Sequence, residues 1–398
     1  MRRLALVFCL FMTFLGVEWE GDGKVPIRQE KNVFVYKHEE ALSELLKAWN
    51  RKRITVLYLG DSHVQNGALT RVFRKRLQEM FGDGGRGLFF PYSLAKSYAP
   101  DDMKSTHSGK WQCSSAMQDD PVLPLGVLGY ACRTDEVGAS FTVEFSKPLK
   151  PGILRIFFAV EGGGAILSVQ TDGKLTKIRA SSSATSPLKI TTKRPTNKVT
   201  LSLVSKESEQ VSFTIFGVSH ERTFVKTFAL VHTAGVGGAR FDGPLLSTLF
   251  VQHLESLSPD LVVLDYGTND ILYNDAIPDK LEQTIRQVIE RVRQAVPKAT
   301  IVLTSVQDLF YKGKNIRSTA EFRTLVQRIA TEERCLFWDW FDIAGGQGSL
   351  LDWQKQGLAR KDLIHLTAQG YELKGQLFFD ALKRTIAQWK KRKTKKPM

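Results

Sequence analysis

The chain has few cysteines and no long apolar segment beyond its N-terminus. Four cysteines occur among 398 residues, and the spacings of its cysteines and histidines match no zinc-binding pattern. Residues 81–87 are rich in glycine, but no Lys-Ser/Thr follows them, and they end a predicted helix instead of opening one. We therefore interpret 81–87 as a shaped surface loop, and the sequence predicts no metal and no organic cofactor.

The cysteines that remain after the N-terminus allow two interpretations. Cys113 and Cys132 lie in one loop-rich region, where they form either a disulfide, as in an oxidising compartment, or two buried thiols. Cys335 begins an apolar strand and is expected in the core. Cys9 belongs to the N-terminal segment described next.

Residues 1–20 are typical of an export signal. Arg2 and Arg3 precede an apolar run over residues 4–17, which is short for a bilayer span. No clear Ala-x-Ala site follows, so a signal peptide and an uncleaved N-terminal anchor both stay open, and a buried N-terminal helix is the structural alternative. Export predicts a location in the periplasm or cell envelope.

The positive charge is concentrated at the C-terminus. The formal net charge is +15, and six basic residues lie among the last nine: Lys390, Lys391, Arg392, Lys393, Lys395 and Lys396. This tail, 389–398, has no apolar face, so we expect it to be disordered. Its charge predicts contact with an anionic wall or membrane surface, and nothing in the sequence indicates nucleic acid as a partner.

Strands and helices alternate in two separate stretches, 51–107 and 228–388, after a lead-in over 21–50. Continuous apolar strands between amphipathic helices predict a doubly wound parallel sheet, an α/β fold. The expected strands are 54–59, 228–232, 261–266, 299–305 and 336–339, and the expected helices are 39–49, 69–80, 245–257, 280–296, 319–333 and 368–390.

The intervening region, 108–227, has a different pattern. Short alternating strands are separated by turns rich in glycine, proline and serine, and no convincing amphipathic helix occurs. The expected strands are 139–145, 153–160, 165–170, 199–204 and 211–218. The pattern predicts an all-β sandwich or jelly roll, inserted into a loop of the α/β domain.

Four segments place reactive side chains after the expected parallel strands, where open α/β sheets carry their active sites. The segments are Gly60-Asp61-Ser62, the turn 233–239, Gly267-Thr268-Asn269-Asp270, and Asp362-Leu363-Ile364-His365. Ser62 becomes a useful nucleophile if His365 accepts its proton and Asp362 orients the imidazole. The Ser62 N–H, a glycine N–H and the Asn269 amide would stabilise the resulting oxyanion. The catalytic residues predicted are Ser62, Asp362 and His365.

Each segment alone also has a structural interpretation, as an Asx-type turn, a strand-to-loop turn or a helix cap. Their occurrence together, in this order, favours catalysis. Among the other histidines, His63 is expected to shape the site. The remaining five are expected on the surface or in the core: His38, His107, His220, His232 and His253.

The four segments resemble the signature blocks of GDSL/SGNH hydrolases. This resemblance implies an SGNH-hydrolase sheet and an oxyanion hole made by Ser62, Gly238 and Asn269. Gly237 stands where the family usually has Ser or Asn. Further segments resemble bacterial peptidoglycan O-acetylesterases that carry a carbohydrate-binding-like β module after the nucleophile block: 81–87, 111–112, 124–126, 337–340, 344–346 and 358–362.

The resemblance implies a serine esterase that removes muramoyl 6-O-acetyl groups from peptidoglycan, so that an O-acetylated glycan is the expected partner. Three alternatives stay open: deacetylation of another polysaccharide, acetyl transfer onto a glycan, and non-catalytic binding of cell-wall glycan. Trp111, Tyr92 and Trp340 are candidates for stacking on sugar rings, with core packing as the alternative, favoured for Trp340.

Overall fold

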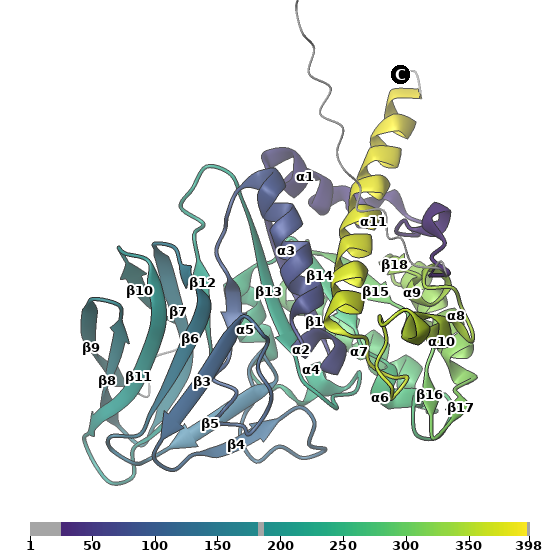
Figure 1. Cartoon of the computed structure of the whole chain (residues 1–398). Helices are drawn as coiled ribbons and strands as arrows, with labels where there is room; N and C mark the ends of the chain where they lie inside the picture. The colour runs from purple at the N-terminus through teal and green to yellow at the C-terminus, as the bar shows by residue number, and fades with distance from the viewer. Residues whose placement is uncertain (1–24, 182–186, 396–398) are drawn as a thin grey trace, which may run out of the picture.

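A five-stranded parallel sheet forms the centre of the molecule in a computed structural model that describes residues 25–181 and 187–395. Its strands lie in the order β13-β1-β14-β15-β18 (Figure 1). They are β1 (Arg53–Gly60), β13 (Phe228–Gly235), β14 (Leu261–Asp265), β15 (Thr300–Thr304) and β18 (Leu336–Trp338). All neighbouring pairs are parallel. All five strands expected from the sequence are confirmed.

Helices cover both faces of this sheet. One face packs on α1 (Ser43–Arg51), α3 (Ala68–Phe81) and α11 (Ala368–Lys395), and α3 lies beside α11 (Figure 1). The other face packs on α5 (Phe250–Leu257), α7 (Leu281–Ala295) and α8 (Ser318–Glu332). The strands therefore bury side chains on both faces, which is why their sequences are continuously apolar.

Short elements connect these layers. The short helices are α2 (Ser62–Gln65), α4 (Gly243–Leu246), α6 (Thr268–Ile271), α9 (Trp340–Ile343) and α10 (Ser349–Lys355), with 3₁₀ turns η1 (Gln29–Lys31) and η2 (Glu39–Leu42) and a small hairpin of β16 (Phe310–Tyr311) and β17 (Lys314–Asn315). The single helix expected over 245–257 is wrong, because α4 and α5 are separate and Ser247 between them is extended, with ψ of 94°.

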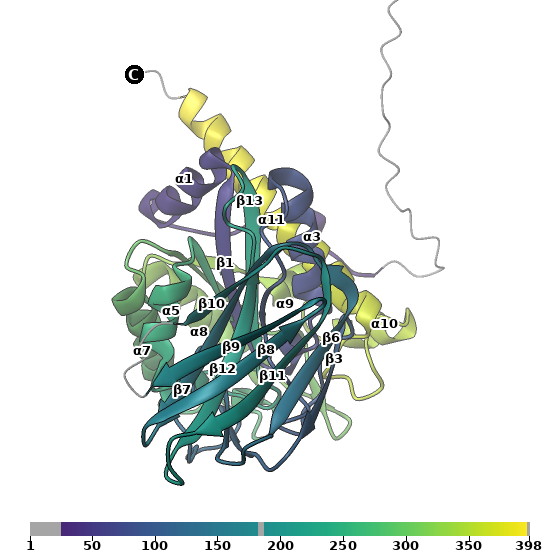
Figure 2. The ribbon, with the colours of Figure 1, turned by 90° about the vertical axis from the view of Figure 1, so that its left-hand side faces the viewer.

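The inserted module consists of two antiparallel sheets (Figures 1 and 2). The first has the order β10-β7-β12-β5-β4, with β2 also on β12, and the second has the order β3-β6-β11-β8-β9. Its strands are β2 (Gly87–Phe89), β3 (Met103–Ser108), β4 (Gln112–Ser115), β5 (Tyr130–Thr134), β6 (Ser140–Leu149), β7 (Gly152–Glu161), β8 (Gly164–Thr171), β9 (Lys174–Ser181), β10 (Leu188–Thr192), β11 (Thr196–Lys206) and β12 (Ser212–Glu221). The five strands expected from the sequence correspond to β6, β7, β8, β11 and β12.

The module begins earlier than the expected residue 108. Strand β2 pairs with β12, and β3 pairs with β6 along its whole length, so both already belong to the module. Cys113 on β4 and Cys132 on β5 form a disulfide, which decides between the two interpretations of these cysteines. Cys335 is a buried free thiol, as expected.

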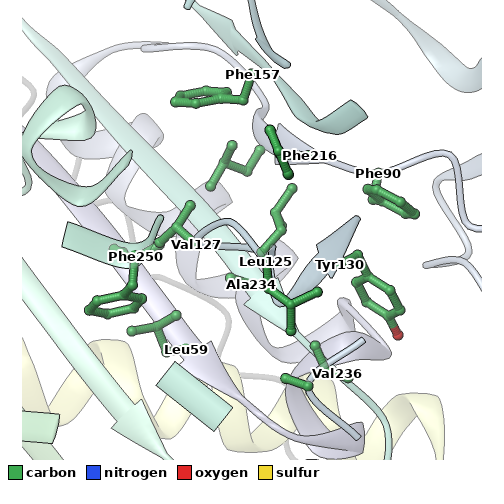
Figure 3. Close-up of a cluster of buried hydrophobic side chains, with 14 of the residues drawn as sticks. Leu59, Phe90, Leu125, Val127, Tyr130, Phe157, Phe216, Ala234, Val236 and Phe250 are labelled. Atoms are coloured by element: carbon green, nitrogen blue, oxygen red, sulfur yellow. The ribbon is translucent and has the colours of Figure 1, made fainter. Parts of the chain in front are cut away.

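The module shares a core with the parallel sheet. Figure 3 shows Leu59 of β1 and Ala234 of β13 in one apolar cluster with Phe157 and Phe216 of the module. Both phenylalanines also contact the ring of His253 on α5, with centroids 4.9 Å and 5.4 Å away. The two parts are therefore packed against each other, and the loops of the module are held at a fixed place beside the sheet.

The C-terminal helix is longer than expected. Helix α11 continues to Lys395, so the disorder expected from residue 389 is wrong for 389–395 (Figures 1 and 2). Ile386 is buried and Trp389 packs against the core, and Lys393 pairs with Glu39 at 2.8 Å.

The expected export signal, 1–20, lies outside the described residues. Among the helices of the described ranges, none is long and apolar enough to cross a membrane.

Candidate active site

Three neighbouring strands bring the first three predicted segments together. Gly60, the last residue of β1, lies in register with Gly235 of β13 on one side and Asp265 of β14 on the other. The segments that contain Ser62, Gly238 and Asn269 therefore leave the sheet side by side at its carboxyl edge. This is the edge at which open α/β sheets bind their ligands.

The fourth segment reaches this edge from the loop between α10 and α11. Ser62 Oγ lies 2.9 Å from His365 Nε2, and His365 Nδ1 lies 2.8 Å from Asp362 Oδ2. With the Nδ1 proton donated to the carboxylate, Nε2 is left to accept the proton of Ser62. The predicted meeting of these three side chains is confirmed, and their arrangement is that of a serine nucleophile with its general base.

The turn that carries Asp362 and His365 is strained at one residue. Leu363 has a φ of 52°, which is uncommon for a residue other than glycine. This conformation lets Asp362 Oδ1 accept the N–H groups of Ile364 at 3.0 Å and His365 at 2.9 Å while Oδ2 faces the imidazole. Partial burial acts to raise the pKa of Asp362, but these hydrogen bonds and His365 outweigh it and hold the pKa below its usual 3.8.

Ser62, the predicted nucleophile, opens the short helix α2. Asp61 caps this helix by accepting the His63 N–H at 2.9 Å. A side chain at Gly60 would place its Cβ 2.5 Å from the Asp265 carbonyl oxygen, so only glycine fits between the strands there. The strand can therefore turn abruptly and present Ser62 at the sheet edge.

The candidate oxyanion donors lie on the neighbouring loops. Gly238 has a φ of 81°, a conformation that favours glycine. Asn269 donates from Nδ2 to the Ala239 carbonyl at 2.9 Å, which joins the β13 and β14 loops. The Nδ2 group has a second hydrogen, so this bond leaves it able to donate to a substrate. These contacts are compatible with the predicted oxyanion hole, whose role remains a prediction.

The structure explains why glycine occupies position 237, where the family usually has Ser or Asn. A Cβ at this position would lie 3.1 Å from Gln65 Oε1 and 3.4 Å from the Tyr98 ring. Gln65 Oε1 also accepts the Gly237 N–H. Two side chains therefore occupy the space that a serine or asparagine would need. Neither Gln65 nor Tyr98 was among the predicted site residues, because no local sequence pattern marks either of them.

His63 lies behind the triad. Its ring centroid is 5.1 Å from that of His365, and its Nδ1 lies 2.8 Å from the Tyr371 hydroxyl. Burial, together with the neighbouring His365, holds the pKa of His63 well below its usual 6.5. A neutral His63 adds no charge to the catalytic imidazole. The other five histidines lie in the core or on the surface, as expected.

Tyr92 is wrong as a candidate for sugar stacking, and for Trp340 the favoured alternative, core packing, is confirmed. Tyr92 is only 4% exposed and Trp340 is completely buried, where it stacks on Trp338. Trp111 is half-buried and its ring contacts Phe141 and Phe213 inside the module. Tyr92 and Trp340 therefore offer no exposed ring face to a sugar.

The glycine-rich loop is also not a surface loop. Gly84, Gly85 and Gly87 are buried, and a Cβ at Gly84 would lie 2.5 Å from the Ala229 carbonyl oxygen. The glycines therefore allow close packing of the loop on β13.

Beside this loop lies a cleft of about 920 Å³, in which Arg71 and Arg86 already pair with carboxylates. Among the described residues, no group of three or more His, Cys, Asp or Glu side chains could hold a metal ion.

Comparison with known families supports this arrangement. Residues 217–373 match the model of the GDSL-like Lipase/Acylhydrolase family. The match contains Gly238, Asn269, Asp362 and His365, whereas Ser62 lies before it, because the module separates the nucleophile from the rest of the domain. Residues 217–373 are therefore similar to a domain of this family. The sheet and this match support a carboxylic ester hydrolase of the GDSL/SGNH type, and Ser62, His365 and Asp362 form its candidate active site.

Solved structures extend the likeness to most of the chain. A structure described as "Peptidoglycan O-acetylesterase in action, 5 min" is 22% identical, and the alignment covers 88% of this chain and 96% of that one with a TM-score of 0.72. The two chains share a fold, and the coverage includes the β module. Two other structures are more distant. A family two carbohydrate esterase from Clostridium thermocellum in complex with cellohexaose is 12% identical, and the alignment covers 65% of this chain and 95% of that one with a TM-score of 0.32. The salicylyl-acyltransferase SsfX3 is 14% identical, and the alignment covers 74% of this chain and 96% of that one with a TM-score of 0.31. No curated protein sequence matches the chain.

Proposed function

We propose that the protein is an O-acetylesterase that removes acetyl groups from cell-wall peptidoglycan, at the 6-hydroxyl of muramoyl residues. The observation that carries the proposal is the contact between Ser62 Oγ and His365 Nε2 at the carboxyl edge of the sheet. The shared fold with a peptidoglycan O-acetylesterase, module included, supports the choice of substrate. The open site agrees with a polymer, since the His365 side chain keeps 29% of its surface exposed.

The reaction begins with attack of Ser62 on the acetyl carbonyl. His365 Nε2 takes the serine proton, and Asp362 stabilises the imidazolium through Nδ1. The carbonyl oxygen becomes negatively charged, and the N–H groups of Ser62 and Gly238 and the Asn269 amide donate to it. Each such donor contributes on the order of 3 kcal/mol to stabilisation of the transition state.

An acetyl–serine intermediate then forms and is hydrolysed. The sugar hydroxyl leaves with the proton from His365, and the acetyl group stays on Ser62 Oγ. His365 next removes a proton from water, which attacks the acetyl carbonyl, and acetate leaves as the proton returns to Ser62. Every step uses side chains and N–H groups of this chain.

The compartment is also a proposal. Peptidoglycan lies outside the cytoplasmic membrane, and the Cys113–Cys132 disulfide is typical of exported proteins. We infer export to the periplasm or cell envelope. The basic end of α11 projects from the body (Figure 2) and would contact an anionic wall or membrane surface.

The test is acetate release from O-acetylated peptidoglycan by the wild-type protein and Ser62→Ala. We expect the variant to lose at least about 10³-fold in rate and to keep the wild-type unfolding temperature. Chemically deacetylated peptidoglycan is the blank, and acetylated xylan measures preference for the glycan. Undiminished acetate release by a folded Ser62→Ala protein would exclude this mechanism. Faster release from xylan than from peptidoglycan would contradict the proposed substrate.

A further inference from the structure

Tyr98 lies exposed beside the nucleophile. Its side chain belongs to the loop between β2 and β3, and the residue keeps 48% of its surface open. Its hydroxyl donates to the Ser62 carbonyl oxygen at 3.3 Å, and its ring occupies the space next to Gly237. A large aromatic side chain therefore stands at the edge of the catalytic site, and the proposed mechanism gives it no role.

A buried hydrogen-bond network fixes the backbone that carries this ring. Gln65 is 1% exposed, and its Nε2 donates to the Tyr98 carbonyl at 2.7 Å and to Ser97 Oγ at 2.8 Å. Its Oε1 accepts from the Gly237 N–H and from the Tyr130 hydroxyl. Gln65 therefore ties the Tyr98 loop to the nucleophile helix and to the β13 loop at once. An exposed ring on a backbone held in this way is pre-organised for a ligand.

A second exposed side chain extends the same surface. Met117, in the turn between β4 and β5, keeps 61% of its surface open. A Cβ at Gly238 would lie 2.9 Å from Met117 Cγ, so the methionine lies against the candidate oxyanion glycine. Both Tyr98 and Met117 belong to the inserted module or its entry loop. The insertion thus supplies apolar surface directly at Ser62.

The proposed substrate would place its pyranose ring beside Ser62 and Tyr98. In a 6-O-acetylated sugar, a single methylene group separates the ester oxygen from the pyranose ring. When the carbonyl carbon is in contact with Ser62 Oγ, the pyranose must lie next to the nucleophile turn. Aromatic rings offer a flat apolar surface at low entropic cost, which suits the C–H face of a sugar.

We propose that Tyr98 is the platform that binds the pyranose ring bearing the acetyl ester, with Met117 extending it. This inference rests on the proposed function. The bond from the Tyr98 hydroxyl to Ser62 fixes the ring plane relative to the nucleophile. Tyr98 therefore selects esters of sugars over small acetyl esters that have no ring.

The test compares two substrates, methyl 6-O-acetyl-N-acetylglucosaminide and ethyl acetate, for wild type, Tyr98→Ala and Tyr98→Phe. Tyr98→Ala is expected to lose at least about tenfold more kcat/KM on the sugar ester than on ethyl acetate, mainly through KM. Tyr98→Phe keeps the ring and is expected to stay within about threefold of the wild-type ratio between the two substrates. Phe224→Ala is the matched control, because Phe224 is an aromatic residue with 63% exposure in the turn that precedes β13, at the opposite edge of the sheet.

The outcomes separate this inference from the proposed function. Equal losses on both substrates in Tyr98→Ala would mean that the residue only supports the nucleophile turn, and no loss on either would also overturn the platform. In both cases the wild-type protein would still release acetate from the sugar ester, so the proposed function would stand. If wild type hydrolyses ethyl acetate but not the sugar ester, the proposed function and the platform both fail.

Discussion

Asp61 is a buried carboxyl next to the proposed nucleophile. It is 1% exposed, and one oxygen accepts the His63 N–H. Burial raises the pKa of Asp61 to about 7, and the nearby Asp265 adds to this effect, whereas the bond from His63 and the charge of Lys374 oppose it. The folded protein therefore keeps a proton on Asp61 at pH values where the unfolded chain has lost it.

This proton makes Asp61→Asn a test of pH-dependent stability. Between about pH 4 and pH 7 the folded wild-type protein binds more protons than the unfolded chain, so its stability falls as the pH rises. Asparagine does not titrate, so the stability of Asp61→Asn relative to wild type should increase over this window, by at most about 4 kcal/mol, and should level off above pH 8. Urea unfolding at pH 5 and pH 8 measures the change. A difference that is constant with pH would contradict the raised pKa.

A control with the opposite sign is available at Asp342. Burial alone would raise the pKa of this carboxyl, but Lys31 and Arg28 lower it below 3.8. Its charge therefore stabilises the fold above about pH 4. The variant Asp342→Asn should lose stability relative to wild type as the pH rises to about 4, and the difference should then stay constant between pH 5 and pH 8, where that of Asp61→Asn changes.

Single residues also show what the sequence could predict. Ser62, Asp362 and His365 were predictable because acyl transfer needs a nucleophile, a base and an orienting carboxylate, and because their order resembles that of a known family. Tyr98 and Gln65 were not, because their importance arises only where the β2–β3 loop meets α2 and the β13 loop in space. Tyr92 could be exposed or buried as judged from the sequence alone, and only the packing of its loop shows that it is buried.

Among the elements, the β4–β5 hairpin carries the exposed Met117 and is closed by the Cys113–Cys132 disulfide. The cross-link joins residues 19 apart in sequence. A loop of that size contributes about 3 kcal/mol to stability by restricting the unfolded chain. The bridge therefore stabilises the pairing of β4 with β5, the strands that flank the loop of Met117.

We expect the double variant Cys113→Ala/Cys132→Ala to lose about 3 kcal/mol of unfolding free energy. Dithiothreitol should lower the stability of the wild-type protein by a similar amount and leave the double variant unchanged. Guanidinium chloride unfolding with and without the reductant gives both numbers. Wild-type protein that is equally stable in dithiothreitol would show that the bridge does not contribute.

Strands and helices were predicted correctly where their burial produces a clear pattern of apolar residues in the sequence. The five parallel strands are buried on both faces, and their apolar runs mark them. Strand β9 was missed because it is mostly exposed and its sequence is polar. The end of α11 was missed because only Ile386 and Trp389 pack against the body, which is too sparse a pattern to distinguish from a disordered tail.

At the scale of the whole molecule, the order of the parallel strands along the chain differs from their order in the sheet. Strand β1 precedes the module, and its neighbours β13 and β14 follow it, so the parallel sheet joins segments from both sides of the module. The sequence predicted this insertion from the change of pattern. It could not predict that the module and the sheet share a core, because that depends on which faces of β7 and β12 meet the sheet.

The shared core predicts that the protein unfolds as a single cooperative unit. Phe216 is 2% exposed and lies between the module and the α/β part (Figure 3), whereas Phe213, also buried, contacts Phe158 and Trp111 within the module. We expect Phe216→Ala and Phe213→Ala each to cost about 3–5 kcal/mol. Loss of acetate release, which reports on the sheet edge, and the near-ultraviolet circular dichroism of the whole chain should then shift together in both variants on heating. If the module were independent, Phe213→Ala would lower an early dichroism transition and leave the loss of activity at the wild-type temperature.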